Sequence, residues 1–270
     1  MKEQVNMRRL IYAIWRLISE RGIKIIGSIL VITAICGFFM VISGLNQSGY
    51  VEVRSVFVIF GLVFGPIIYI WILANEFTNN SQGISYLLLP SSIFEKWIIN
   101  NLLGIGFYFL SFASIFRFLD IKIVAKINSR LSNIDAYSEN LSRINILRFD
   151  QELFYIPMTL GIIVSLGILI GALHFKKNAL FYSLGIILII SVMLLVINYV
   201  IAKIVFGKIL IFDFKSIIPF NTILVKPEGS IKNFLLYSPF DGKLLFFMIA
   251  IPIIGICSWI YYYKIREKDL

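Results

Sequence analysis

The side chains that most often carry chemistry are scarce in this chain. It has one histidine, His174, and two cysteines, Cys36 and Cys257. An intramembrane metalloprotease needs a His-Glu-x-x-His arrangement, which a single histidine cannot supply. The cysteines lie inside apolar runs without a C-x-x-C spacing, which is typical of packing rather than of a disulfide or a metal site. The sequence therefore predicts neither a metal centre nor a disulfide.

A nucleotide site is also not predicted. The two Gly-Lys pairs, at 207–208 and 242–243, lack the earlier glycine of a phosphate-cradling loop. We therefore expect no enzymatic activity and no cofactor in this chain. If it moves a substrate against a gradient, the energy has to come from another subunit.

The clearest local motif is Ser92-Ile93-Phe94-Glu95. Its S-x-x-E spacing is that of a capping box, in which the serine oxygen accepts from the Glu95 N–H and the carboxylate accepts from the Ser92 N–H. Pro90 disfavours helical geometry at Leu89. A short element is therefore predicted to end near Leu89, and a new helix to begin at Ile93. This is either a well-capped helix start or a stiff corner that passes a push from one element to the next.

The composition predicts the kind of protein that holds this motif. Of the 270 residues, 59% are hydrophobic and 15% are charged, whereas soluble domains carry about 25% charged residues. Such a chain cannot cover itself with polar surface, which indicates an integral membrane protein. The net charge of +10 is spread over short polar connections. It favours contact with membrane lipid headgroups over nucleic-acid binding.

Six stretches are long and apolar enough to cross a bilayer, which needs about 20 residues. We expect an all-α integral membrane protein, with one transmembrane domain over 1–270. None of the stretches contains Asp, Glu, Lys or Arg, which argues against a proton- or cation-driven carrier. The predicted spans are 25–45, 55–75, 97–116, 153–173, 179–202 and 244–263.

The first 24 residues predict an amphipathic helix on the membrane surface. Apolar residues recur there at helical spacing, and six basic residues are available for its polar side. The connection at 46–54 holds a single basic residue. By the positive-inside rule the N terminus is therefore cytoplasmic. Six spans bring the C terminus back to the same side.

This topology makes 76–96 a cytoplasmic connection, and 117–152 and 203–243 extracytoplasmic ones. Within 117–152, apolar residues at 124, 127, 131 and 134 predict an amphipathic helix that lies on the protein or the outer leaflet, or binds a partner. Residues 209–225 are apolar but interrupted by charges and a proline. They predict a segment that dips into the outer leaflet and returns.

Two pairs of glycines have the spacing of close helix contacts. Gly61 and Gly65 lie in the second predicted span, and Gly167 and Gly171 lie in the fourth. Such pairs let helix backbones approach closely, although the spacing also arises by chance in apolar helices.

The stretch YLLLPSSIFEKWIINNLLG, 86–104, supplies a resemblance. It is similar to an LPAS..EKF signature in a Bacteroidetes branch of the permease subunits of type-two ABC exporters. The corresponding residues are Leu89, Pro90, Ser92, Glu95, Lys96 and Trp97. Ser91 replaces the usual alanine, and Trp97 the usual phenylalanine. The rest of the chain resembles these permeases only in its predicted topology.

The resemblance implies a partner and a set of functional residues. The partner is a separate ABC ATPase subunit that binds ATP and magnesium, and it rests on a coupling helix at about 79–92. The permease forms a homodimer, or a heterodimer with a related permease, in the bacterial cytoplasmic (inner) membrane. The segment before the sixth span becomes a re-entrant helical hairpin. The expected coupling residues are Gln82, Tyr86, Leu87, Leu88, Pro90, Ser92 and Glu95.

Two other classes of protein fit the sequence. The chain is a non-transporting scaffold or sensor that binds partners through 121–135, or it is a secondary carrier that needs no coupling ion. Deleting that helix distinguishes the scaffold, and transport by the chain alone in liposomes distinguishes the carrier.

Overall fold

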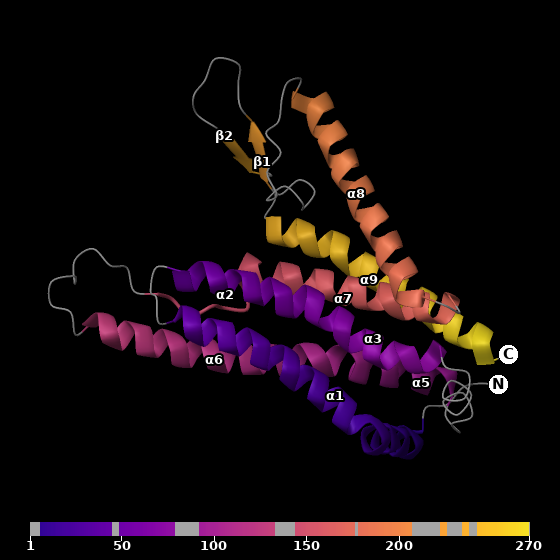
Figure 1. Ribbon diagram of the computed structural model, residues 1–270. Helices are drawn as coiled ribbons and strands as arrows, with labels where there is room; N and C mark the ends of the chain where they lie inside the picture. The colour runs from indigo at the N-terminus through magenta and orange to yellow at the C-terminus, as the bar shows by residue number, and fades with distance from the viewer. Residues whose placement is uncertain are drawn as a thin grey trace.

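The computed structural model describes residues 6–44, 49–78, 92–132, 144–175, 178–206, 222–225, 234–237 and 242–269. Within these ranges the chain folds into long helices and one small β-hairpin (Figure 1). Long apolar runs form helices because each backbone N–H and C=O then finds its partner within the same segment.

The second predicted span and the start of the third are each interrupted by a π-helical segment, labelled η. In chain order the helices are α1 (Met7–Ser43), α2 (Tyr50–Ile59), η2 (Phe60–Phe64), α3 (Gly65–Thr78), α5 (Ile93–Asn101), η3 (Leu102–Gly106), α6 (Phe107–Ser132), α7 (Glu152–His174), α8 (Ala179–Phe206) and α9 (Gly242–Asp269).

Within the described part of the chain, five segments are long and apolar enough to cross a membrane, which makes the chain a multi-pass helical membrane protein. They are Gly22–Ser43, Tyr50–Leu73, Ile93–Arg130, Glu152–His174 and Phe246–Glu267. The other predicted span, 179–202, coincides with α8, whose apolar portion Ala179–Met193 is shorter than these five.

Helix α7 is the centre of the bundle. It packs against α2 and α3, and also against α8 and α9, and it is the most buried of the five candidate spans. Figure 1 shows α1, α3, α6 and α7 side by side, whereas α8 leaves the bundle after its first turns. The apolar core lies between α1, the helices of the second and third predicted spans, and α7.

The surface helix predicted at 1–24 and the first span are not separate elements. They form one helix, α1, which Figure 1 shows nearly end-on in its first part and then running along the bundle. No proline interrupts 7–43, so the backbone hydrogen bonds continue across the predicted boundary. Met7, Tyr12 and Trp15 are exposed, while Ala13 and Leu17 are buried, so this part remains amphipathic.

The third span is much longer than predicted. Helix α6 continues past 116 to Ser132 because 107–132 contains neither glycine nor proline. The 38 residues of Ile93–Arg130 cover about 57 Å, against about 30 Å of hydrocarbon. The amphipathic helix predicted in this connection is therefore the end of α6. Val124 and Ile127 are buried in the chain's own core, whereas the Leu131 side chain and residue 134 of the same predicted face lie outside the described part of the chain.

The connection before α9 contains two short strands. Thr222–Val225 (β1) and Phe234–Tyr237 (β2) pair in antiparallel fashion, with Thr222 opposite Tyr237. Both strands consist of residues that favour extended backbone. Of the re-entrant segment predicted at 209–225, only β1 belongs to the described residues. The prediction of an all-α fold did not include this hairpin.

All four glycines predicted at helix contacts lie against neighbouring helices. A methyl group at any of them would approach a side chain there to 3.0 Å or less. The partners are Phe112 for Gly61, Tyr108 for Gly65, Ile187 for Gly167 and Ser183 for Gly171. Two contacts are with α6 and two with α8, so small residues set the spacing of both helix pairs.

Gly161 of α7 is a fifth such glycine, and sequence spacing did not single it out. A Cβ there would strike the carbonyl oxygen of Leu62, which is backbone and cannot rotate away. We expect Gly161→Ala to destabilise the protein by about 1–3 kcal/mol through overpacking. The measurement is unfolding in mixed detergent micelles followed by circular dichroism.

Gly255→Ala in α9 is the matched control, because nothing lies within 4 Å of a Cβ at that position. We expect it to be neutral or to stabilise the helix by about 0.5–1 kcal/mol. Equal losses for the two variants would contradict the close contact between α7 and η2.

Candidate functional site

The candidate site is built around the start of α5. Ser92 is the N-cap in extended conformation, and its hydroxyl oxygen accepts from the Glu95 N–H at 3.2 Å. In return Glu95 Oε2 accepts from the Ser92 N–H at 2.9 Å. The predicted capping box is confirmed.

The Glu95 carboxylate also binds a second helix. Its Oε1 atom accepts from the Asn6 N–H at 2.8 Å. Asn6 is the N-cap of α1, and its own side chain accepts from the Arg8 N–H at 3.1 Å. One carboxylate thus joins the N-terminal ends of α1 and α5. Both ends carry partial positive charge from the helix dipole, which favours a negative group between them.

Glu95 is fully buried, with an exposed fraction of 0%. A carboxylate can remain in such a place because backbone donors and helix ends replace its water shell. It points into the protein and is not a surface contact for a partner. Its role here is to fix the relative positions of two helices.

Helix α5 is held on both sides. On one side Ile99 and Leu103 pack against Ala13 and Leu17 of α1. These contacts continue the link that Glu95 and Asn6 begin, so α5 and the first part of α1 are joined over several turns.

On its other side α5 meets the last helix, α9. Trp97 Nε1 donates to the carbonyl of Ser258 at 3.1 Å, and Asn100 Nδ2 donates to the hydroxyl oxygen of Tyr261 at 2.8 Å. The Trp97 and Tyr262 rings meet edge to face, 6.4 Å apart between centroids. We call this junction of α1, α5 and α9 the corner. Displacing the start of α5 would displace both the first and the last helix.

Gln82, Tyr86, Leu87, Leu88 and Pro90 lie outside the described residues. Sequence reasoning missed the contributions of Asn6, Asn100 and Tyr261. Only Asn6 gave a signal, since asparagine directly before an amphipathic run is a preferred N-cap.

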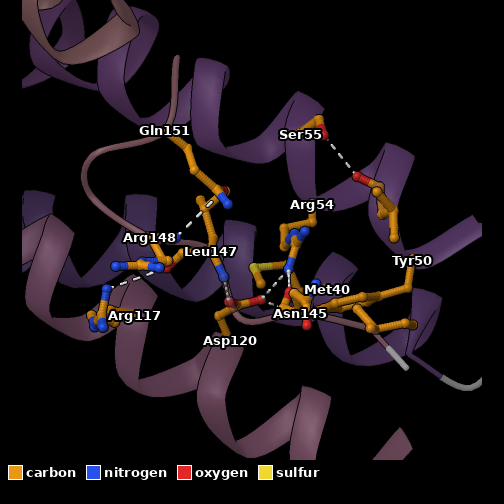
Figure 2. Close-up of polar contacts among 12 residues, drawn as sticks. Met40, Tyr50, Arg54, Ser55, Arg117, Asp120, Asn145, Leu147, Arg148 and Gln151 are labelled. Atoms are coloured by element: carbon orange, nitrogen blue, oxygen red, sulfur yellow. Dashed lines mark hydrogen bonds and ion pairs between the residues drawn. The ribbon is translucent and has the colours of Figure 1, made fainter. Parts of the chain in front are cut away.

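A second buried polar cluster lies between α2 and α6 (Figure 2). Asp120 of α6 accepts from the Tyr50 hydroxyl at 2.7 Å and lies 3.4 Å from Arg54 Nη1. The ion pair is buried, with exposed side-chain fractions of 8% for Arg54 and 1% for Asp120. It joins the start of α2 to the middle of α6.

The same cluster holds the segment 144–149, which has no regular secondary structure and which we call the strap. Asp120 Oδ2 accepts from the Leu147 N–H at 2.8 Å, and Arg54 Nη1 donates to the Asn145 carbonyl at 2.8 Å. Figure 2 shows Arg54 and Asp120 converging on the strap from the two helices.

Two further side chains of α6 bind the strap. Asn128 bonds both the N–H and the carbonyl of Ile144, at 3.2 and 3.1 Å. Arg117 donates to the Leu147 carbonyl at 3.2 Å and lies 4.5 Å from the centre of the Phe149 ring. The strap is thus fastened along α6 before α7 begins.

Both clusters link helices through buried polar contacts. Among the described residues no group of three or more His, Cys, Asp or Glu side chains could hold a metal ion. The buried carboxylates at both ends are engaged by backbone donors, which leaves them poorly placed as general bases. Comparisons with known protein families, with curated proteins and with solved structures find no match to this chain.

Proposed function

We propose that this chain is the permease subunit of an ATP-driven ABC exporter. The observation that carries the proposal is the corner. It lies within the stretch that resembles the exporter signature, and it ties the start of α5 to α1 and α9 through Glu95, Trp97 and Asn100. A push delivered at 79–92 would reach three helices at once.

The remaining features of the proposal fit this arrangement. Asn6, at the start of α1, and Tyr261, near the end of α9, both contact α5, which supports N and C termini on one side of the membrane. The basic residues near both ends favour the cytoplasmic side. In this proposal the chain has six spans, lies in the bacterial cytoplasmic membrane and pairs with a second permease. Two ATPase subunits bind at 79–92.

The decisive experiment is purification of the complex from its native membrane in mild detergent. We expect an ABC ATPase to copurify and its ATP turnover to depend on the permease. Leu87→Asp places a charge in the expected coupling segment and should abolish both. Leu110→Asn, at a lipid-exposed position of α6, is the control and should preserve them. A complex without an ATPase, or full turnover with Leu87→Asp in a folded chain, refutes the proposal.

The scaffold alternative needs a sharper test than deleting the end of α6, because Val124 and Ile127 belong to the core. Substituting the exposed residues Ile121 and Ala125 by Glu alters only the outer face. A scaffold would lose its partner in this variant, whereas a permease would keep its ATPase. A secondary carrier would transport in liposomes without any other subunit.

A further inference from the structure

The two π-helical segments each leave one backbone carbonyl without its usual donor. In η2 the Gly65 N–H bonds the carbonyl of Phe60, and in η3 the Phe107 N–H bonds that of Leu102. These are steps of five residues instead of four. In an α-helix the Gly65 and Phe107 N–H groups would instead donate to the carbonyls of Gly61 and Leu103. Those two carbonyls therefore need donors from elsewhere.

Two tyrosines supply these donors reciprocally. Tyr108, just after η3, donates to the Gly61 carbonyl in η2 at 2.6 Å. Tyr69, just after η2, donates to the Leu103 carbonyl in η3 at 2.6 Å. Both tyrosines are fully buried, and their ring centroids are 5.1 Å apart. We call this arrangement, Gly61 with Tyr108 and Leu103 with Tyr69, the latch.

Pro66 explains why the Gly61 carbonyl cannot be satisfied within its own helix. The five-residue step would bring the N atom of residue 66 to it, and proline has no N–H. The proline ring would also clash with the carbonyl four residues earlier in a regular helix. The π segment relieves that clash and leaves Tyr108 as the donor.

Gly65 makes room for this contact. A Cβ at that position would meet the Tyr108 hydroxyl, so only glycine lets the hydroxyl pass to the carbonyl of Gly61. The glycine pair recognised in the sequence thus serves a hydrogen bond as well as close packing.

The latch lies where α2 passes into α3 and where α5 passes into α6. On one side of it lie α3 and α5, and α5 takes part in the corner. On the other side lie α2 and α6, which hold the Arg54–Asp120 pair. A π segment differs from an α-helix by one inserted residue and is one of the few places where a long helix bends.

We propose that the latch locks a hinge: with both tyrosine hydroxyls in place the two halves of these helices move as one body, and when the hydroxyls withdraw, α3 and α5 move relative to α2 and α6. This inference rests on the geometry alone and holds whether or not an ATPase drives the motion.

The first test asks whether Pro66 creates the need for Tyr108. Tyr108→Phe should lower the unfolding temperature by roughly 2–6 °C. Pro66→Ala restores a backbone N–H. In the Pro66→Ala background, Tyr108→Phe should therefore lower the unfolding temperature by less than half as much. Tyr69→Phe is the internal control, because the carbonyl to which Tyr69 donates, that of Leu103, lies in η3. It should lower the unfolding temperature equally in both backgrounds. Equal effects of Tyr108→Phe with and without Pro66 would overturn the assignment.

The second test measures the hinge directly. Spin labels are placed at the exposed positions Val51 and Trp71, which flank η2, after Cys36 and Cys257 are replaced by Ala. The distance between the labels is measured by double electron–electron resonance. In the double variant Tyr69→Phe, Tyr108→Phe we expect the distance distribution to be at least twice as wide as in the native chain. Labels at the exposed positions Leu110 and Arg130, both within α6 and also 20 positions apart, should give an unchanged width. An unchanged width for the pair across η2 would refute the hinge.

Discussion

Asp120→Leu should lower the free energy of unfolding by about 3–5 kcal/mol, since it leaves the Arg54 charge buried without its counter-charge. Asp120 also accepts from the Tyr50 hydroxyl and the Leu147 N–H. Both donors would lose their partner in a place that water does not reach. The measurement is equilibrium unfolding in mixed micelles.

A double substitution separates the charge from the other contacts. Arg54→Met in the Asp120→Leu chain removes the unpaired charge, so the double variant should be more stable than the single one. It should remain less stable than the native protein, because Tyr50 and Leu147 still lack an acceptor. A double variant that is less stable than Asp120→Leu alone would contradict this account.

Asp150→Leu is the matched surface control. Its ion pair with Arg148 has the same 3.4 Å separation, but the side chains are 72% and 58% exposed. Exposed pairs contribute about 0–1 kcal/mol, so burial rather than distance should account for the difference between the two variants.

The second large effect is expected at the corner. Glu95→Gln should destabilise the protein by about 1.5–3 kcal/mol, because the charged acceptor for two backbone N–H groups is lost. The amide can accept with one atom only. Its NH₂ group would then face the N–H of Asn6 or of Ser92, which are both donors. The same unfolding measurement applies.

Glu20→Gln provides the comparison for Glu95. Glu20 lies on the surface of α1, where it pairs with Arg16 at 2.7 Å and is 51% exposed. We expect a change below about 0.5 kcal/mol. If Glu95→Gln were equally mild, the carboxylate would not be the link between α1 and α5.

The local elements of this fold could be predicted from the sequence, because their signals are local. Apolar runs gave the long helices, and the spacing of Ser92 and Glu95 gave the capping box. The contact between Asn6 and Glu95 spans 89 positions, and no periodicity within either segment encodes it.

The pair of Arg54 and Asp120 was missed for a different reason. Both lie just beyond predicted spans, so they counted as parts of polar connections. Neighbouring antiparallel helices bring such ends together. A basic residue just before the second predicted span and an acidic residue shortly after the third were therefore a usable signal for this ion pair. The length of α6 could likewise have been inferred from the absence of helix breakers in 107–132.

The latch could be anticipated only in part. Pro66 indicates a disturbed helix, but nothing near it identifies Tyr108 as the donor that compensates for it. That pairing depends on how two helices lie against each other, and therefore on tertiary packing.

The way the strap is bound has a consequence for how this protein can change over evolution. The hydrogen bonds that join Arg54, Arg117, Asp120 and Asn128 to the strap all involve its main chain, at Ile144, Asn145 or Leu147. Any amino acid offers the same carbonyl, and any except proline the same N–H. Distant relatives can therefore diverge freely at 145, 146 and 148. The four helix residues are the ones by which such relatives would be recognised.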